Sequence, residues 1–134
     1  HLIDIMATAV DLAGAKYPTE YAGHAVLPME GVSLRPAFQG KPLGRTQPIF
    51  WEHEGNKAVR DGKWKLVQKW RGPWELYDME ADRTELHDLA AAHPEITARL
   101  AAAWQSWQQR AFVDEWTGPD HTSWGQDIKP RQDK

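Results

Sequence analysis

The sequence predicts an α+β fold, in which a four-stranded antiparallel meander is packed by a C-terminal amphipathic helix. Two observations predict this fold. Between Ile49 and Tyr77, runs rich in Trp, Val and Tyr are cut by three turn signals, Glu54-Gly55-Asn56, Asp61-Gly62 and Arg71-Gly72-Pro73, as is typical of an antiparallel meander. Further along, apolar residues recur at helical spacing over residues 96–111. We therefore expect the helix to lie across the apolar face of the sheet.

The N-terminal part begins with a predicted helix of about three turns. Its apolar residues recur at helical spacing: Leu2, Ile3, Met6, Val10 and Ala13. Gly14 stands where a residue with a left-handed backbone would end the helix. From Lys16 to Lys41, prolines and glycines break the pattern and predict an irregular connector, with one helical turn at Ser33 to Phe38.

Four strands are expected, at Ile49 to His53, Lys57 to Arg60, Lys63 to Trp70 and Trp74 to Asp78. Asp61-Gly62, between the second and third strands, favours a tight type I′ turn. In the third strand Trp64, Leu66 and Trp70 share one face and the lysines at 63, 65 and 69 share the other, so one face should be buried and one wet. Val67 falls on the lysine face, which suggests a bulge or partial cover there.

The C-terminal helix is the best defined element of the sequence. Pro94 suits its first position, and Glu95 favours its positive end. Its apolar stripe consists of Ile96, Leu100, Ala103, Trp104 and Trp107. Before it, Asp82 and Glu85 have the spacing of a capping box and predict a short turn of helix over residues 86–90. Beyond Trp116, a polar sequence with a lone Trp124 predicts a tail that frays or packs on something outside this chain.

The composition excludes several classes of function. The 134 residues are 41% hydrophobic and 26% charged, as is typical of a soluble globular domain. The formal net charge of -3 is not segregated, so no basic face indicates nucleic acid. The chain has no Cys, which removes disulfides, thiolate metal sites and a cysteine nucleophile. No apolar segment is long enough to span a membrane. Because the chain opens at His1 without an initiator Met, we expect a preceding segment to be missing.

Five segments, taken in order, resemble the C-terminal part of the sulfatase family. They are His1 to Thr8 with Asp11 to Ala15, Gly31 to Pro36 with Gly40, Trp51 to Asn56, Ala58 to Val67, and Glu75 to Asp78 with Asp82 to Ala90. They are similar to the family patterns hiDlxPTlldlAG, DGxSLxPlLxG, WEHxGNxAVRxGxWKLV and ELYDLxxDPxExxNLA. Ala7 and Arg83 replace prolines of these patterns, and Asp88 replaces an Asn. All three positions are structural, so the departures concern local turns rather than the family.

The resemblance implies a division into three parts. Residues 1–47 would be the end of the catalytic domain, with the first helix belonging to an alkaline-phosphatase-like α/β core. Residues 48–116 would form the C-terminal subdomain of antiparallel sheet and helix, and residues 117–134 the polar tail.

The resemblance also implies a function. The parent enzyme would hydrolyse sulfate esters of a small molecule or a glycan, using formylglycine and calcium in an N-terminal catalytic domain that this chain lacks. The chain does not contain the Cys-x-Pro/Ala-x-Arg motif that matures to formylglycine, so no catalytic residue, metal ligand or cofactor is expected in it. It would complete the fold and shape the substrate mouth, with the missing domain as its partner. A periplasmic or secreted location is implied.

Two alternatives stay open at this stage. The chain could be a stand-alone carbohydrate- or protein-binding module, with its aromatic sheet as the binding surface. It could also derive from a phosphonate or phosphate ester hydrolase of the same superfamily, because the C-terminal strands do not report which oxyanion is cleaved. The gene sequence upstream of His1 would separate these interpretations.

His53 and Asn56 are the candidate substrate-binding residues. His53 ends a strand beside a turn, where its imidazole could reach a sulfated substrate. The simpler interpretation is that His53 and Asn56 only bind backbone groups of the turn. Glu52, His53 and Glu54 are metal-ligand residue types, but neighbours on a strand point to opposite faces, so a zinc site is not expected.

The remaining charged and aromatic residues have simpler structural interpretations. Arg60 and the lysines at 63, 65 and 69 could attract an anionic substrate, although a solvated face explains them more simply. Trp64, Trp104 and Trp107 are expected in the core. The tryptophans expected to be buried against the missing domain are Trp70, Trp74, Trp116 and Trp124.

Overall fold

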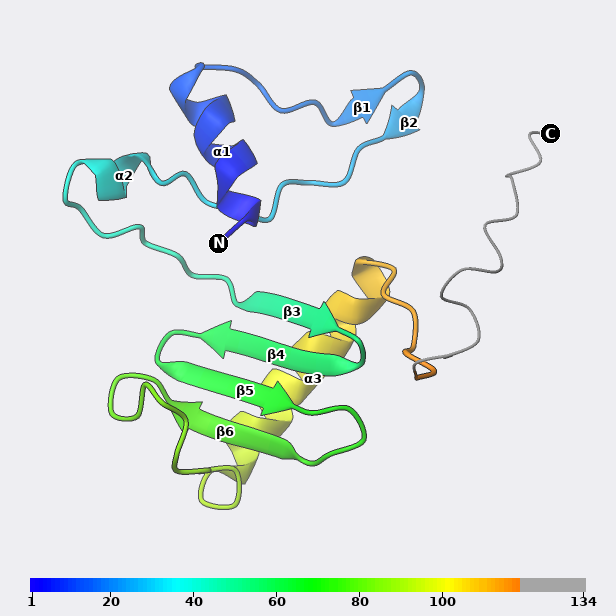
Figure 1. Ribbon diagram of the computed structural model, residues 1–134. Helices are drawn as coiled ribbons and strands as arrows, with labels where there is room; N and C mark the ends of the chain where they lie inside the picture. The colour runs from blue at the N-terminus through cyan, green and yellow to red at the C-terminus, as the bar shows by residue number, and fades with distance from the viewer. Residues whose placement is uncertain (119–134) are drawn as a thin grey trace, which may run out of the picture. The chain divides into compact units, whose positions relative to one another are not determined.

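The computed structural model describes residues 1–118 and divides the chain into two compact units, with the boundary in the sequence between Thr46 and Gln47. Figure 1 shows the elements of each unit, which are considered separately below. Of the predicted tail, residues 119–134 with Trp124 lie outside the described residues. Within the described part, no helix combines the length and the apolar character needed to cross a bilayer.

The first unit contains two helices and a small hairpin. The elements are α1 (Ile3–Leu12), β1 (Glu20–Tyr21), β2 (His24–Ala25) and α2 (Arg35–Phe38). The predicted N-terminal helix and the helical turn before Phe38 are both present. The hairpin was not predicted: Ala22 and Gly23, with φ of +50° and +82°, form its turn, and Ala-Gly is a weak signal for the positive φ angles that such a turn requires.

The end of α1 follows the prediction for Gly14. This residue has a φ of +60°, and its N–H donates to the Asp11 carbonyl at 3.1 Å. The next N–H, of Ala15, donates to the Val10 carbonyl at 3.0 Å. Two such bonds form a Schellman motif, which satisfies carbonyls that the helix leaves without partners.

Asp4 fastens the connector to α1. Its side chain is 2% exposed, and Oδ1 accepts hydrogen bonds from the Val32 N–H at 2.9 Å and from the Arg45 guanidinium. Oδ2 accepts a bond from the His1 ammonium at 2.9 Å. A buried carboxylate is stable only when such partners replace water, so Asp4 joins three segments of the first unit.

The connector also depends on close backbone contact with α1. Thr8 donates its hydroxyl to the Asp4 carbonyl at 2.7 Å and accepts the Leu34 N–H at 2.9 Å. A Cβ on Gly31 would lie 2.0 Å from the Ile3 carbonyl oxygen, so any other residue here would displace the connector. The sulfatase-like segments at the N-terminus and after Glu30 are therefore the two halves of one packing motif.

The second unit is a four-stranded antiparallel sheet covered on one face by a helix, which confirms the predicted α+β class. Its strands follow the order β3-β4-β5-β6. They span Ile49–His53, Asn56–Asp61, Trp64–Gln68 and Trp74–Asp78, and the helix α3 spans Pro94–Arg110. The core consists of residues that are at most 1% exposed: Val59, Leu66, Leu76, Leu100 and Trp104.

The β4–β5 hairpin corrects the predicted register. Asp61 pairs with Trp64, so the loop is Gly62-Lys63 rather than Asp61-Gly62. Only Gly62 has a positive φ, of +55°, whereas a type I′ turn needs two. The observed register places Val59 opposite Leu66, whereas the predicted register would have placed Lys57 there. Burial of this apolar pair therefore decides the register.

Two further expectations were wrong, and a third is narrowed to one of its alternatives. Val67 pairs in regular register with Ala58 and Glu75, so the bulge is excluded and partial cover of that face remains. Trp70 does not belong to β5, because the strand ends at Gln68. No helical turn forms over residues 86–90.

The predicted turn of helix fails for a local reason. Asp82 accepts the N–H groups of Leu86 and His87 at 2.7 and 2.8 Å, as a helix cap would. However, Glu85 has a φ of +60°, a left-handed backbone that breaks a right-handed helix. Asp88 then accepts the Leu76 N–H at 2.9 Å, so the segment follows the outer edge of β6.

Acid is expected to loosen the first unit through Asp4. Burial pushes the pKa of its carboxyl up, but hydrogen bonds from the His1 ammonium, Val32 and Arg45 outweigh burial and lower the pKa from 3.8 to about 2. Because the folded-state pKa is depressed, this stabilisation is fully present above pH 3.8 and is lost as the pH falls towards 2. Amide exchange protection of Val32, corrected for intrinsic rates, should fall in that window. Asp4→Asn should abolish the dependence and Asp11→Asn should retain it; an unchanged profile in Asp4→Asn would contradict the assignment.

Candidate functional site

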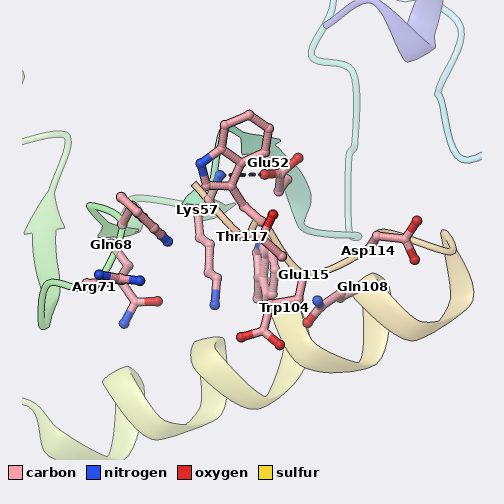
Figure 2. A pocket seen from close by; sticks show the side chains of 12 residues that line it. Glu52, Lys57, Gln68, Arg71, Trp104, Gln108, Asp114, Glu115 and Thr117 are labelled. Atoms are coloured by element: carbon pink, nitrogen blue, oxygen red, sulfur yellow. Dashed lines mark hydrogen bonds between the residues drawn. The ribbon is translucent and has the colours of Figure 1, made fainter. Parts of the chain in front are cut away.

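A pocket of about 500 Å³ lies in the second unit, between the β3–β4 turn, the end of β5 and the residues that follow α3 (Figure 2). Its lining combines tryptophan rings with charged and amide side chains. The lining residues are Glu52, Gly55, Lys57, Gln68, Trp70, Arg71, Trp104, Gln108, Asp114, Glu115, Trp116 and Thr117.

Strand alternation places three of these side chains on the helix side of the sheet. Glu52, Lys57 and Gln68 lie opposite one another on β3, β4 and β5. On each strand they are two residues from the core row that contains Val59, so they share its face. The Lys57 ammonium lies 4.6 Å from the centroid of the Trp104 ring, which is a cation–π contact.

The corner after β5 forms one wall of the pocket. Arg71 has a φ of +61°, and its guanidinium lies 4.3 Å from the centroid of the Trp70 ring. Gly55 passes close to both indoles that line this end, since a Cβ there would lie 2.5 Å from Trp70 and 3.0 Å from Trp116. With its φ of +79°, Gly55 is the residue that allows the turn and the tryptophans to meet.

The end of α3 and the residues after it form the opposite wall. The Trp104 indole N–H donates to the Trp51 carbonyl at 3.0 Å and fixes the ring beneath β3. Gln108 donates its amide to the Val113 carbonyl at 3.3 Å, which turns the chain back towards the pocket. Asp114 and Glu115 are exposed on this segment.

The structure places His53 and Asn56 at the β3–β4 turn, outside the lining of this pocket. Asn56 donates its amide to the His53 carbonyl at 2.8 Å and accepts the Trp70 N–H at 3.1 Å. The His53 side chain is 83% exposed, with Nδ1 4.0 Å from the Glu54 carboxylate. Asn56 thus joins its own turn to the corner after β5, while His53 presents its ring to solvent.

Three of the four basic residues singled out in the sequence have partners nearby, and the fourth, Lys69, is exposed. Arg60 donates to the Gly62 carbonyl at 2.7 Å. Lys63 donates to Asp78 at 2.5 Å, and this hydrogen bond holds the pKa of the Asp78 carboxyl below its usual range. Lys65 pairs with Glu85. These contacts favour a structural role for the three side chains.

The sheet face opposite α3 is partly covered, which accounts for Val67. The Lys65 and Glu85 pair lies on this face, and the Tyr77 hydroxyl donates to Glu75 at 2.7 Å. This hydrogen bond, together with burial, raises the pKa of Tyr77 to about 12. Val67 therefore has polar neighbours that are themselves paired.

Six of the described tryptophans lie in the core, against it or at the pocket. Trp64, Trp104 and Trp107 belong to the core or pack against it, as predicted. Trp74, expected to be buried elsewhere, also packs on this core, with its ring 6.4 Å from that of Trp104. Trp70 and Trp116 line the pocket.

Sequence reasoning missed Lys57, Arg71 and Gln108 as pocket residues. Lys57 could have been found, because it is two positions from Val59 and so shares the face of a core residue. Arg71 and Gln108 carried no such signal, since a turn and a helix end meet here only in the fold. In the described residues, no three His, Cys, Asp or Glu side chains converge to hold a metal ion.

Comparisons with known proteins agree with the fold and show the family of the chain. The chain belongs to the sulfatase family, and the similarity falls in the C-terminal part of these proteins. It is 32% identical to an uncharacterised sulfatase of Schizosaccharomyces pombe over 126 residues, which is 89% of this chain and 22% of that protein. It is 37% identical to the choline-sulfatase of Rhizobium meliloti over 95 residues, 66% of this chain and 17% of that enzyme.

A solved structure supports the same relationship. Ps i-CgsB matches with a TM-score of 0.60 and 27% identity, covering 78% of this chain and 23% of that one. No family model matches the chain. The chain therefore spans about a fifth of the length of the relatives to which it is similar.

Replacing Asn56 should test its role at the turn. Asn56→Ala removes two hydrogen bonds to backbone groups, so we expect the free energy of unfolding to fall by about 1 kcal/mol. His53→Ala, its matched control, should change it by less than about 0.5 kcal/mol. Urea unfolding of the two variants measures both values, and equal losses would show that Asn56 is not the residue that fastens the turn.

Proposed function

We propose that the chain is the C-terminal segment of a sulfatase that hydrolyses sulfate esters, and that it completes the fold and shapes the substrate mouth. The observation that carries this proposal is the similarity to sulfatases over 89% of the chain, within 22% of the length of one such relative. The packing of Asp4 and Gly31 adds support, because both lie in the segments that resemble the family and both are needed to fold the first unit.

The outer side of α1 supports a role in completing a larger fold. Its apolar side chains are exposed to 57–79%: Leu2, Ile5, Met6 and Leu12. A row of this kind on a surface helix is normally covered by another element. We assign the cover to the N-terminal catalytic domain of the sulfatase, which is then the principal partner of this segment.

The chemistry of the whole enzyme would come from that domain. Formylglycine and calcium belong to it in this proposal, and formylglycine cannot arise from a cysteine of this chain, which has none. The substrate would be a sulfated small molecule or glycan. The proposal also includes the periplasmic or secreted location that the family resemblance implies.

His53 is the residue that we propose to reach the substrate. Its ring is exposed at the β3–β4 turn, which Asn56 fastens to the corner after β5. A hydrogen bond from imidazole to a charged group contributes about 1.5–3 kcal/mol. An exposed ring on a fixed turn can donate such a bond without disturbing the sheet.

The kinetic test uses the whole enzyme. His53→Ala should lower kcat/KM for its sulfate ester by about one to two orders of magnitude, with little change in melting temperature. Glu54→Gln, at the neighbouring position, is the control and should retain activity. If His53→Ala instead loses stability and keeps its activity per folded molecule, His53 belongs to the turn and not to the substrate mouth.

The segment itself is expected to be inactive. The 134-residue chain contains no cysteine that could mature to the formylglycine nucleophile. Incubated with p-nitrophenyl sulfate and calcium, the purified chain should release nitrophenol no faster than a matched blank, whereas a full-length sulfatase serves as the positive control. Turnover above the blank that co-purifies with the chain would overturn this part of the proposal.

A further inference from the structure

The pocket of the second unit contains two cations that lack an acidic partner. Among the described residues, neither the Lys57 nor the Arg71 side chain forms an ion pair or donates a hydrogen bond, and each lies over a tryptophan ring, at 4.6 and 4.3 Å from the centroids. Lys63 provides the contrast: it lies 4.7 Å from the Trp64 centroid, but its ammonium is bonded to Asp78. The donors of Lys57 and Arg71 are thus available to a ligand.

The two cations are also held in position. Lys57 stands on a central strand with Gln68 opposite, and Arg71 lies in a turn that is closed by a bond from the Gly72 N–H to the Lys69 carbonyl at 2.8 Å. Contact with an indole restricts each long side chain before a ligand arrives. Binding then costs less side-chain entropy than it would for a freely moving lysine or arginine.

In the described part of the chain, none of the acidic residues that line the pocket forms an ion pair with Lys57 or Arg71. Figure 2 shows Gln68 and Arg71 on one side of Lys57, with Gln108 and Asp114 on the other. Glu52 is engaged by the Gly55 N–H at 2.8 Å, whereas Asp114 and Glu115 are exposed. The pocket therefore has a wall that donates hydrogen bonds to an anion and a wall that accepts them from hydroxyl groups.

A tryptophan completes the set of groups. Trp116 lines the pocket and is 36% exposed, so its ring offers a flat apolar surface. An acidic sugar has an oxyanion, several hydroxyls and an apolar ring face, and these three features correspond to the three kinds of group in the pocket. A volume of about 500 Å³ lies within the range of small-molecule sites.

We propose that this pocket binds an acidic saccharide, with Lys57 and Arg71 as the ligands of its oxyanion. Asp114 and Glu115 accept hydrogen bonds from its hydroxyls, and Trp116 contacts the ring. The proposal goes beyond sulfate ester hydrolysis and does not depend on it, because it concerns binding by residues of this chain alone.

Calorimetric titration of the purified chain tests the proposal. The probes are glucose 6-sulfate, glucose and inorganic sulfate. Glucose 6-sulfate should bind saturably, and glucose and inorganic sulfate should each bind at least tenfold more weakly. Lys57→Gln and Arg71→Gln should each raise the Kd for glucose 6-sulfate at least tenfold, while Lys63→Gln, the matched lysine outside the pocket, should leave it within twofold.

Further outcomes keep the test decisive. Lys57→Arg retains the charge and should retain most of the affinity, and amide NMR spectra establish that each variant is folded. No saturable binding of glucose 6-sulfate, or undiminished binding in Lys57→Gln and Arg71→Gln, would overturn the proposal. Equal affinity for inorganic sulfate and glucose 6-sulfate would overturn the saccharide assignment, because the anion alone would then account for binding.

Discussion

The second unit depends on how one buried indole joins α3 to the sheet. Trp104 is 1% exposed and packs in the cluster that contains Val59 and Leu66, and its N–H is bonded to the Trp51 carbonyl. An indole buried without a partner for its N–H would lose about 1–3 kcal/mol, so this bond fixes the position of the ring along β3. The same ring then receives Lys57 on the pocket side. Core packing and pocket geometry are therefore set by a single side chain.

The fold was predictable wherever one local pattern decided it. The four strands, the long helix and the left-handed Gly14 follow from alternation, helical spacing and a capping signal that act over a few residues. The β4–β5 loop was misplaced by one residue because Asp61-Gly62 is a strong local signal, but the pairing of Val59 with Leu66 outweighs it. When the preferred turn and the burial of apolar side chains favour different registers, burial determines the register.

The pocket was much less predictable, because its walls come from segments that are far apart in the sequence. Strand alternation could have placed Lys57 on the helix side, but no local pattern brings Arg71 towards Gln108. At the β3–β4 turn, by contrast, residue type alone singled out two candidate residues, His53 and Asn56. The structure shows two backbone hydrogen bonds for Asn56 and an exposed ring for His53, so two neighbours with the same sequence signal have different surroundings.

The segment that follows Asp82 has a consequence for how the sheet can grow. Leu76, in the middle of β6, already uses its outward N–H with Asp88 and its carbonyl with the Leu89 N–H at 2.8 Å. At the other end of the strand order, β3 has no strand beyond it among the described residues. A fifth strand, from this protein or from another chain, can therefore extend the sheet only beside β3, since the β6 side is closed to backbone pairing.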